Sequence, residues 1–201
     1  MELADNSISL LPYDHRDSAE VFPACGLGEI QKAFREFFDR PWAALTYNGR
    51  GAIDAVMRSL PLVRDDEVFI TTTFDYPNVS SCVTSTIFNY CKPARVLSDR
   101  SKAILVIHEF GVPHRNTPQL RELADQRGIP LIEDCAHTIN SHRDDWQVGF
   151  FGDFVVVSFS KIFPVPLGGM LLGKEIPCVL TDLQEQAVTK VLPASTHTLE
   201  N

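Results

Sequence analysis

Apolar residues recur along this chain in two patterns: short unbroken runs, and positions three or four residues apart. Unbroken runs of four to eight apolar residues are typical of strands that are buried on both faces. Spacings of three and four indicate a helix with one buried face. The pattern predicts strands over residues 43–47, 68–72, 95–97, 103–107, 130–133, 154–158 and 170–172. It predicts helices over residues 28–40, 52–60, 77–88, 116–127 and 176–190.

Strands that alternate with helices in this way predict an α/β fold. We expect a three-layer sandwich, with helices on both faces of a mostly parallel sheet. Residues 1–24 show no clear period and are expected to form an N-terminal arm. Residues 25–175 are expected to form one large domain, and residues 176–201 a C-terminal helix with a polar tail.

Composition narrows the class of protein. Of 201 residues, 44% are apolar, which is enough for a core, and the net charge of −8 argues against nucleic acid or an anionic membrane as the main partner. No apolar run is long enough to span a membrane, and the first residues lack the features of a signal peptide. The five cysteines are scattered and form no C-x-x-C pair, so the sequence predicts no metal site, no disulfide framework and a cytoplasmic location.

Polar side chains follow five of the predicted strands, at the point where each strand ends. In parallel sheets the carboxyl ends of the strands meet at one edge, and ligands bind there. Five strand ends that converge on this edge are stronger evidence for a site than any single motif. The residues that follow these strands are 48–50, 73–76, His108, Asp134 and Lys161.

A lysine and a carboxylate at this edge indicate a particular chemistry. Lys161 follows the strand over 154–158, and Asp134 follows the strand over 130–133. A lysine amine can form a Schiff base, and a carboxylate can keep a pyridine nitrogen protonated, which together are the minimal protein contribution to pyridoxal phosphate chemistry. This role requires a lowered pKa for Lys161, which we expect from partial burial. Taken singly, Lys161 is also consistent with an exposed turn lysine, and Asp134 with a helix cap or loop aspartate.

Other side chains near this edge have two interpretations each. His137 can reach the phenolic oxygen of such a cofactor, or it has a structural role. Tyr76, and with less support Phe74, can stack on a flat cofactor or pack in the core. His108 either lines the site or is structural. A nucleophilic role for Cys135 is disfavoured, because a neighbouring histidine is its only basic partner.

Residues 47–52 read as a strand, a turn with two glycines, and the start of a helix. Free backbone N–H groups at a helix start can hold a phosphate, here at Gly49 and Arg50, and the arginine adds a positive charge. Ser158, which ends a strand, can contribute a hydroxyl. The alternative interpretation is a tight turn with an exposed arginine.

Taken together, these motifs resemble the large domain of the DegT/DnrJ/EryC1/StrS family, the sugar aminotransferases of fold type I. The matching stretches run in the order of the family from about residue 25 to residue 173. They are residues 48–53, 66–69, 106–111, 132–137, 148–154, 158–161 and 168–169.

The resemblance implies a cofactor and a role for each candidate residue. The cofactor is pyridoxal 5′-phosphate, and Lys161 is both its Schiff-base lysine and the proton shuttle at the substrate carbon. Asp134 pairs with the pyridine nitrogen, and His137 stands where the family has glutamine or histidine. The remaining cofactor-binding residues that the resemblance implies are Gly49, Arg50 and Ser158 around the phosphate, and Tyr76 over the ring.

The implied reaction transfers an amino group, commonly from glutamate, to a keto sugar carried on a nucleotide. The family's dehydratase branch is disfavoured because it replaces the lysine with histidine. A homodimer is expected, since sites of this fold type lie between two subunits.

Members of the family are usually longer and carry a small C-terminal domain that this sequence lacks. The alternative is therefore a truncated, non-catalytic relative or one chain of a split enzyme, which acts as a binding partner. A more remote alternative is another fold type I reaction, such as decarboxylation or cysteine desulfuration.

Overall fold

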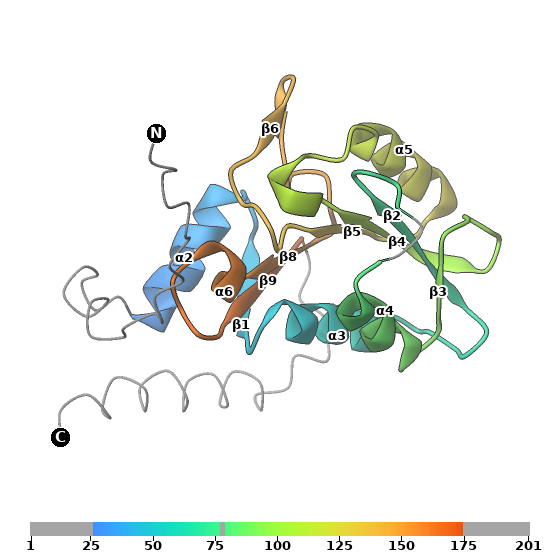
Figure 1. Cartoon of the computed structure of the whole chain (residues 1–201), viewed down its shortest axis with the longest axis horizontal. Coiled ribbons are helices and arrows are strands. Elements are labelled where there is room, and N and C mark those ends of the chain that lie inside the picture. Colours follow the sequence, from blue (N-terminus) through green and yellow to red (C-terminus); the bar gives the residue numbers. More distant parts are fainter. Residues whose placement is uncertain (1–25, 77–78, 175–201) are drawn as a thin grey trace, which may run out of the picture.

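A computed structural model describes residues 26–76 and 79–174 of the chain (Figure 1). Its helices are α2 (Leu27–Phe37), α3 (Gly49–Ser59), α4 (Ser81–Phe88), α5 (Thr117–Arg127) and α6 (Phe159–Ile162), with a 3-10 turn η1 (Glu109–Gly111). Its strands are β1 (Trp42–Thr46), β2 (Glu67–Thr72), β3 (Lys92–Ala94), β4 (Ser101–Ile107), β5 (Leu131–Asp134), β6 (His142–Arg143), β7 (Trp146–Gln147), β8 (Phe154–Ser158) and β9 (Gly169–Gly173). The predicted arm over 1–24 and the predicted segment over 176–201 lie outside the described residues.

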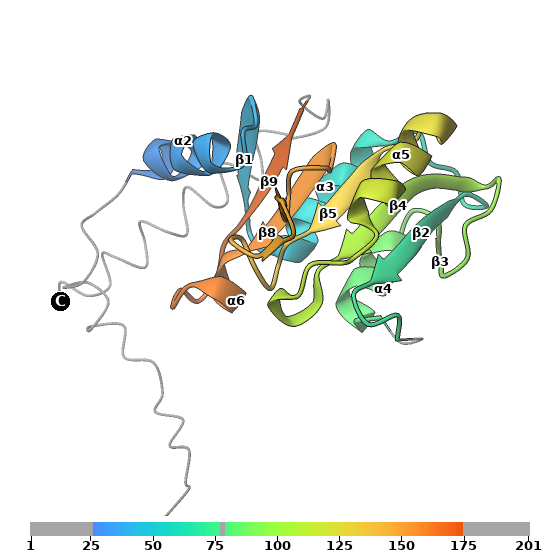
Figure 2. The same ribbon diagram turned by 90° about the horizontal axis from the view of Figure 1, so that it is seen from above.

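Seven of the strands form one sheet in the order β1-β9-β8-β5-β4-β2-β3 (Figure 2). Strands β8, β5, β4, β2 and β3 run parallel to one another, whereas β9 runs antiparallel to both β1 and β8. Strand β1 therefore runs in the same direction as β8. The carboxyl ends of β1, β2, β4, β5 and β8 lie on one edge of the sheet, as the sequence predicts.

Helices cover both faces of this sheet. Helices α3 and α4 lie on one face, and α2 and α5 lie on the other (Figures 1 and 2). Ile53 of α3 packs in one buried cluster with Val68 of β2, and Ala124 of α5 packs in another with Leu131 of β5. Burial of this apolar surface against both faces stabilises the three layers. The predicted three-layer α/β fold is confirmed.

The strand predicted over 95–97 is wrong. The strand in this region is β3, which pairs with β2 through Lys92 opposite Glu67. Its central residue is Pro93, which cannot donate a ladder hydrogen bond and is tolerated because β3 is an edge strand. Val96, whose apolar side chain suggested a strand, is 75% exposed.

Helix α3 begins three residues earlier than the predicted start at residue 52. The side chain of Asn48 accepts a hydrogen bond of 2.9 Å from the N–H of Gly51, which caps the helix. Gly49 therefore lies in the first turn of α3 and faces the edge of the sheet. Among the described helices, none combines the length and the apolar character that crossing a membrane requires.

Candidate active site

The side chains of Thr72, Asp134 and Ser158 point to one face of the sheet, at the edge where the parallel strands end. The register places Thr72 opposite Ile107, Ile107 opposite Asp134, and Asp134 opposite Val156. Ser158 lies two residues beyond Val156, so it points to the same face as Asp134 and Thr72. This is the face that α3 covers. Thr72, which the sequence analysis did not select, has a buried hydroxyl with no hydrogen-bond partner among the described residues.

Asp134 lies at the end of β5 and is buried. One of its carboxylate oxygens accepts a 2.9 Å hydrogen bond from the N–H of Ala136, and the other accepts none from residues 26–76 or 79–174. Burial raises the pKa of Asp134, and the Ala136 N–H and the nearby charges of Lys161 and His137 oppose that rise. A buried carboxylate with one open oxygen suits a cationic N–H partner.

Lys161 meets His137 at the same edge. The Nζ atom of Lys161, on α6, lies 3.3 Å from Nε2 of His137. The predicted partial burial of Lys161 is wrong, because its side chain is exposed. Burial lowers the pKa of His137, and the charge of Lys161 lowers it further.

Aromatic rings extend this site toward the end of β2. The ring of Phe110 stacks on His137, with centroids 5.5 Å apart and planes inclined by 22°. Phe110 also lies 6.2 Å from Phe74, which lies 6.3 Å from Tyr76. Phe74 and Tyr76 are exposed, which rules out the alternative that they pack in the core. Sequence analysis missed Phe110, because an apolar residue before Gly111 carries no signal of its own.

The start of α3 packs closely against β8. A Cβ atom added to Gly49 would lie 3.1 Å from Cβ of Ser158, and one added to Gly169 would lie 2.7 Å from the carbonyl carbon of Asn48. The N–H groups of Gly49 and Arg50 donate to no acceptor within the described part of the chain. Two open N–H groups beside the Ser158 hydroxyl and the exposed Arg50 side chain form a set of donors for an anion.

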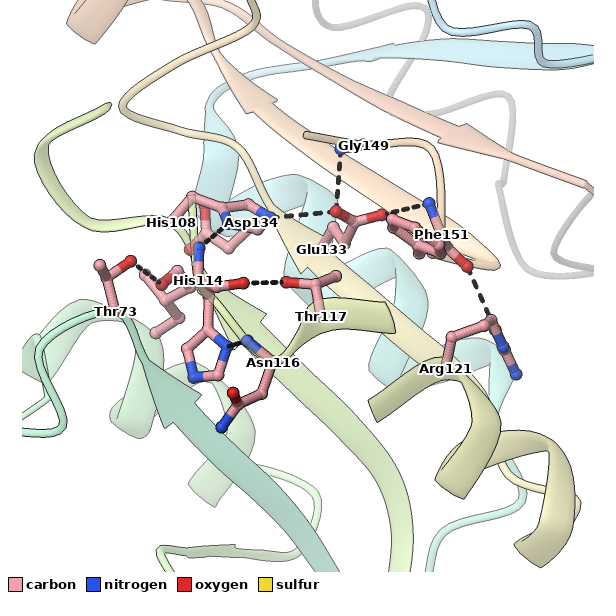
Figure 3. Close-up of polar contacts among 12 residues, drawn as sticks. Thr73, His108, His114, Asn116, Thr117, Arg121, Glu133, Asp134, Gly149 and Phe151 are labelled. Atoms are coloured by element: carbon pink, nitrogen blue, oxygen red, sulfur yellow. Dashed lines mark hydrogen bonds and ion pairs between the residues drawn. The ribbon is translucent and has the colours of Figure 1, made fainter. Parts of the chain in front are cut away.

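His108 does not line this site. It is fully buried, and its Nε2 lies 3.0 Å from Glu133 while its Nδ1 accepts the N–H of His114 at 3.0 Å (Figure 3). Glu133 alternates with Asp134 along β5 and therefore points to the opposite face of the sheet. The structure favours the structural interpretation of His108 over a role in the site.

Glu133 organises the loop that precedes β8. Its two carboxylate oxygens accept N–H groups from Gly149 at 2.9 Å and Phe151 at 2.8 Å (Figure 3). They also accept the N–H of Gly152 at 2.5 Å. Burial acts to raise the pKa of Glu133, but the hydrogen bonds from His108 and these backbone groups outweigh it and hold the pKa low. Glu133 is thus a buried anion that fixes the loop.

Arg40 holds the same loop through its carbonyl groups. Its Nη2 atom donates to the carbonyl oxygens of Gly149 at 2.7 Å and Gly152 at 3.1 Å. Gly149 has a φ of 85°, and a Cβ there would lie 2.4 Å from the Phe38 ring. The loop is therefore fixed from both sides, and it sets the start of β8, which leads to Lys161.

Cys135 remains unsuited to nucleophilic chemistry, as the sequence predicts. Its side chain is fully buried, and burial raises the pKa of its thiol well above the ordinary value. Within the two described ranges, no group of three His, Cys, Asp or Glu side chains is placed to hold a metal ion.

The sheet order and the helices on both faces define the large domain of fold type I pyridoxal phosphate-dependent transferases. Comparison with known families supports this class: residues 88–175 match the sequence profile of the DegT/DnrJ/EryC1/StrS aminotransferase family. Residues 88–175 are thus similar to that family, which confirms the resemblance predicted from the motifs.

Two curated relatives and one solved structure illustrate the likeness. GDP-perosamine synthase from Vibrio cholerae is 28% identical over 163 residues, which are 73% of this chain and 44% of that protein. A dTDP-3-amino-3,4,6-trideoxy-alpha-D-glucose transaminase from Micromonospora megalomicea subsp. nigra is 32% identical over 125 residues, 56% of this chain and 33% of that protein. The X-ray structure of the aminotransferase from Psychrobacter cryohalolentis superposes with a TM-score of 0.64 at 26% identity, over 74% of this chain and 41% of that one.

The chain spans less than half the length of these relatives. The likeness therefore establishes the fold of the shared region and not the activity of a whole protein.

Pyridoxal phosphate fits the residues at this edge. Asp134 offers a buried carboxylate with an open oxygen, Lys161 an accessible amine, and the start of α3 a set of N–H donors. The buried, unpaired hydroxyl of Thr72 lies on the same face. A phosphate, a pyridine nitrogen and an aldehyde are the three groups that this set of donors and acceptors can serve.

Proposed function

We propose that this chain is the cofactor domain of a pyridoxal phosphate-dependent aminotransferase, which transfers an amino group to a keto sugar. The observation that carries the proposal is the contact of 3.3 Å between Lys161 and His137, at the edge where Asp134 is buried with one open oxygen. An amine, an imidazole and a carboxylate from two neighbouring strand ends meet the requirements of this chemistry.

Seven residues would hold the cofactor or act on its substrate. Asp134 would hold the proton of the ring nitrogen, and the open N–H groups at the start of α3 would bind the phosphate. When bound, the cofactor supplies an electron-accepting ring that stabilises negative charge at the substrate carbon. The residues that would line the cofactor are Lys161, Asp134, His137, Gly49, Arg50, Ser158 and Tyr76.

Lys161 would carry the cofactor and move the proton. Its amine is exposed, so a carbonyl compound can reach it without a conformational change. The free base of this amine would take a proton from the substrate carbon and return it elsewhere. The N–H of His137 would orient that amine by hydrogen bonding to it.

The keto sugar substrate is inferred from the relatives. The two relatives described above are named for a GDP-linked and a dTDP-linked sugar, and others are named as aminotransferases of scyllo-inosose compounds. A nucleotide-linked keto sugar is our proposed acceptor, with glutamate as donor. Glutamine appears in the names of some of those relatives, so both amino acids belong in the assay. A homodimer or a partner chain, a cytoplasmic location and a cofactor domain over 25–175 complete the proposal.

An absorption titration with pyridoxal phosphate tests cofactor binding. We expect a visible band from the wild-type protein and from Lys102→Ala, which removes an exposed lysine of β4, but no such band from Lys161→Ala. The absence of the band from wild type, or its persistence in Lys161→Ala, would contradict the proposal.

A donor assay tests the reaction. Addition of glutamate or glutamine is expected to remove the visible band, and a keto sugar is expected to restore it. A stable band that neither amino acid changes would instead support the alternative, a relative that binds the cofactor and serves as a binding partner or as one chain of a split enzyme.

A further inference from the structure

Phe110 has an unusual combination of backbone and exposure. Its φ of 52° and ψ of 29° place it in the left-handed region, which side chains with a Cβ atom rarely adopt. Its ring is 76% exposed, so burial in the core does not account for its position. A strained backbone beneath an exposed aromatic ring needs a cause in the surrounding contacts.

Hydrogen bonds to the end of β2 hold this segment in place. The N–H of Glu109 donates to the Thr73 hydroxyl at 3.1 Å, and that hydroxyl donates to the carbonyl of Val112 at 2.7 Å. In return, a carboxylate oxygen of Glu109 accepts the N–H of Phe74 at 3.1 Å. Residues on both sides of Phe110 are therefore fixed, and its left-handed conformation follows from a rigid loop.

The result of this conformation is a pair of contacts with His137. The backbone N–H of Phe110 donates to Nδ1 of His137 at 3.2 Å, and the Phe110 ring stacks on the imidazole. A neutral imidazole carries one proton. Since Nδ1 accepts a hydrogen bond, that proton is on Nε2.

The tautomer of His137 determines which form of the Lys161 amine can accept a hydrogen bond from it. Nε2 of His137 faces Nζ of Lys161 at 3.3 Å, and an Nε2–H group is a donor. It can only donate to an amine that has a lone pair, which is the uncharged and nucleophilic form of lysine. An ammonium group has no lone pair and would face another donor.

We propose that Phe110 is a positioning residue, which fixes His137 as the Nε2–H tautomer and so presents an Nε2–H donor to the amine of Lys161. The catalytic consequence of this arrangement rests on the proposed function. The assignment of the His137 tautomer is independent of that function. The groups that face His137 are Lys161 from α6, Asp134 from β5 and Glu109 from η1. Partial burial of the imidazole, which lowers its pKa, helps to keep it neutral.

Nitrogen NMR of the cofactor-free protein tests the tautomer directly. Histidine labelled with ¹⁵N distinguishes a protonated ring nitrogen from an unprotonated one, and His137→Gln identifies the His137 signals by their loss. We expect an unprotonated Nδ1 and a protonated Nε2 above the pKa of His137. A protonated Nδ1 in the wild-type protein would overturn the proposal.

Two substitutions separate the N–H of Phe110 from its ring. Phe110→Gly keeps the N–H and adopts a positive φ without strain, so the tautomer should persist while the pKa of His137 rises with the loss of the ring. Phe110→Pro removes the N–H and cannot reach a positive φ, so the exclusive tautomer should be lost. Phe88→Ala removes an exposed ring of α4, which lies outside these contacts, and it should match wild type.

An unchanged tautomer in a folded Phe110→Pro protein would overturn the role of Phe110. If that variant does not fold, the wild-type spectrum and Phe110→Gly still decide the proposal. These spectra need no cofactor, so their outcome is separate from that of the absorption titration. If His137 is the Nε2–H tautomer but the protein does not bind pyridoxal phosphate, the proposed function is wrong and the inference about Phe110 still holds.

Discussion

At the residue scale, His137 links the loop after β4 to Lys161. It accepts from Phe110 through one ring nitrogen and contacts Lys161 through the other. The sequence predicts Lys161, Asp134 and His137 as site candidates because each follows a strand with a strong apolar pattern. It does not predict Phe110, since its contact with His137 spans 27 residues and depends on a backbone conformation that no local pattern encodes.

A matched pair of substitutions at His137 tests the polarity of this contact. In His137→Gln an amide oxygen can accept from Phe110 and the NH₂ group can donate to Lys161, so both contacts are kept. In His137→Glu the carboxylate can only accept, and its charge favours the ammonium form of Lys161. We expect the glutamine variant to bind pyridoxal phosphate within about threefold of the wild-type rate, and the glutamate variant to bind it at least about tenfold more slowly.

Stopped-flow absorbance at a fixed, mildly alkaline pH measures these rates. Equal rates for the two variants would show that donor polarity at position 137 has no influence on Lys161.

At the element scale, the loop over 149–152 joins the hairpin of β6 and β7 to β8, and buried Glu133 and Arg40 fix it from two sides. Long apolar strands and amphipathic helices were predictable because their period repeats over many residues. Helix α6 and the β6–β7 hairpin were not, since four-residue and two-residue elements are too short to show a period. The hydrogen bonds that Glu133 accepts from this loop come from residues 16 to 19 positions away, which sequence spacing does not reveal.

Substitution of Glu133 tests how much this loop depends on one anion. Glu133→Gln keeps the shape but places an NH₂ group against backbone N–H donors, so we expect a loss of about 3–5 kcal/mol in the free energy of unfolding. Glu122→Gln alters an exposed carboxylate of α5 and should change it by less than about 0.5 kcal/mol. Urea denaturation measures both; a loss below about 1 kcal/mol for Glu133→Gln would contradict the role of Glu133.

At the scale of the whole molecule, the order of the sheet brings strand ends that are far apart in sequence to one edge. Residues 48–50 and Lys161 are more than 100 positions apart, yet β1 and β8 both flank β9. The sequence predicts the mostly parallel class from alternating elements. It does not give the order of the strands or the antiparallel direction of β9, because an apolar strand that is buried on both faces reads the same in either direction.

The stability of the native state at acid pH is a property of the whole molecule. Burial, followed by the charge of His108, lowers the pKa of His114 from 6.5 to about 4. As the pH falls below 6.5, the unfolded chain binds a proton at His114 that the native state excludes. The contribution of neutral His114 to the free energy of unfolding is therefore complete above pH 6.5 and is lost as the pH falls to about 4. The loss amounts to about 3 kcal/mol at most.

Chemical denaturation at pH 7 and at pH 4 checks this expectation. His114→Gln should lose less stability over that interval than wild type, whereas His142→Gln, which replaces an exposed histidine of β6, should behave like wild type. Equal losses for wild type and His114→Gln would exclude His114 as the source.

The most direct test of the central claim is to trap the cofactor on the chain. Wild-type protein would be incubated with pyridoxal phosphate, reduced with borohydride, digested and mapped by mass spectrometry. We predict one dominant site of cofactor attachment, at Lys161, and its loss in Lys161→Ala without transfer to Lys174 or Lys102. Attachment spread over exposed lysines, or no attachment at Lys161, would contradict the assignment of this edge as a pyridoxal phosphate site.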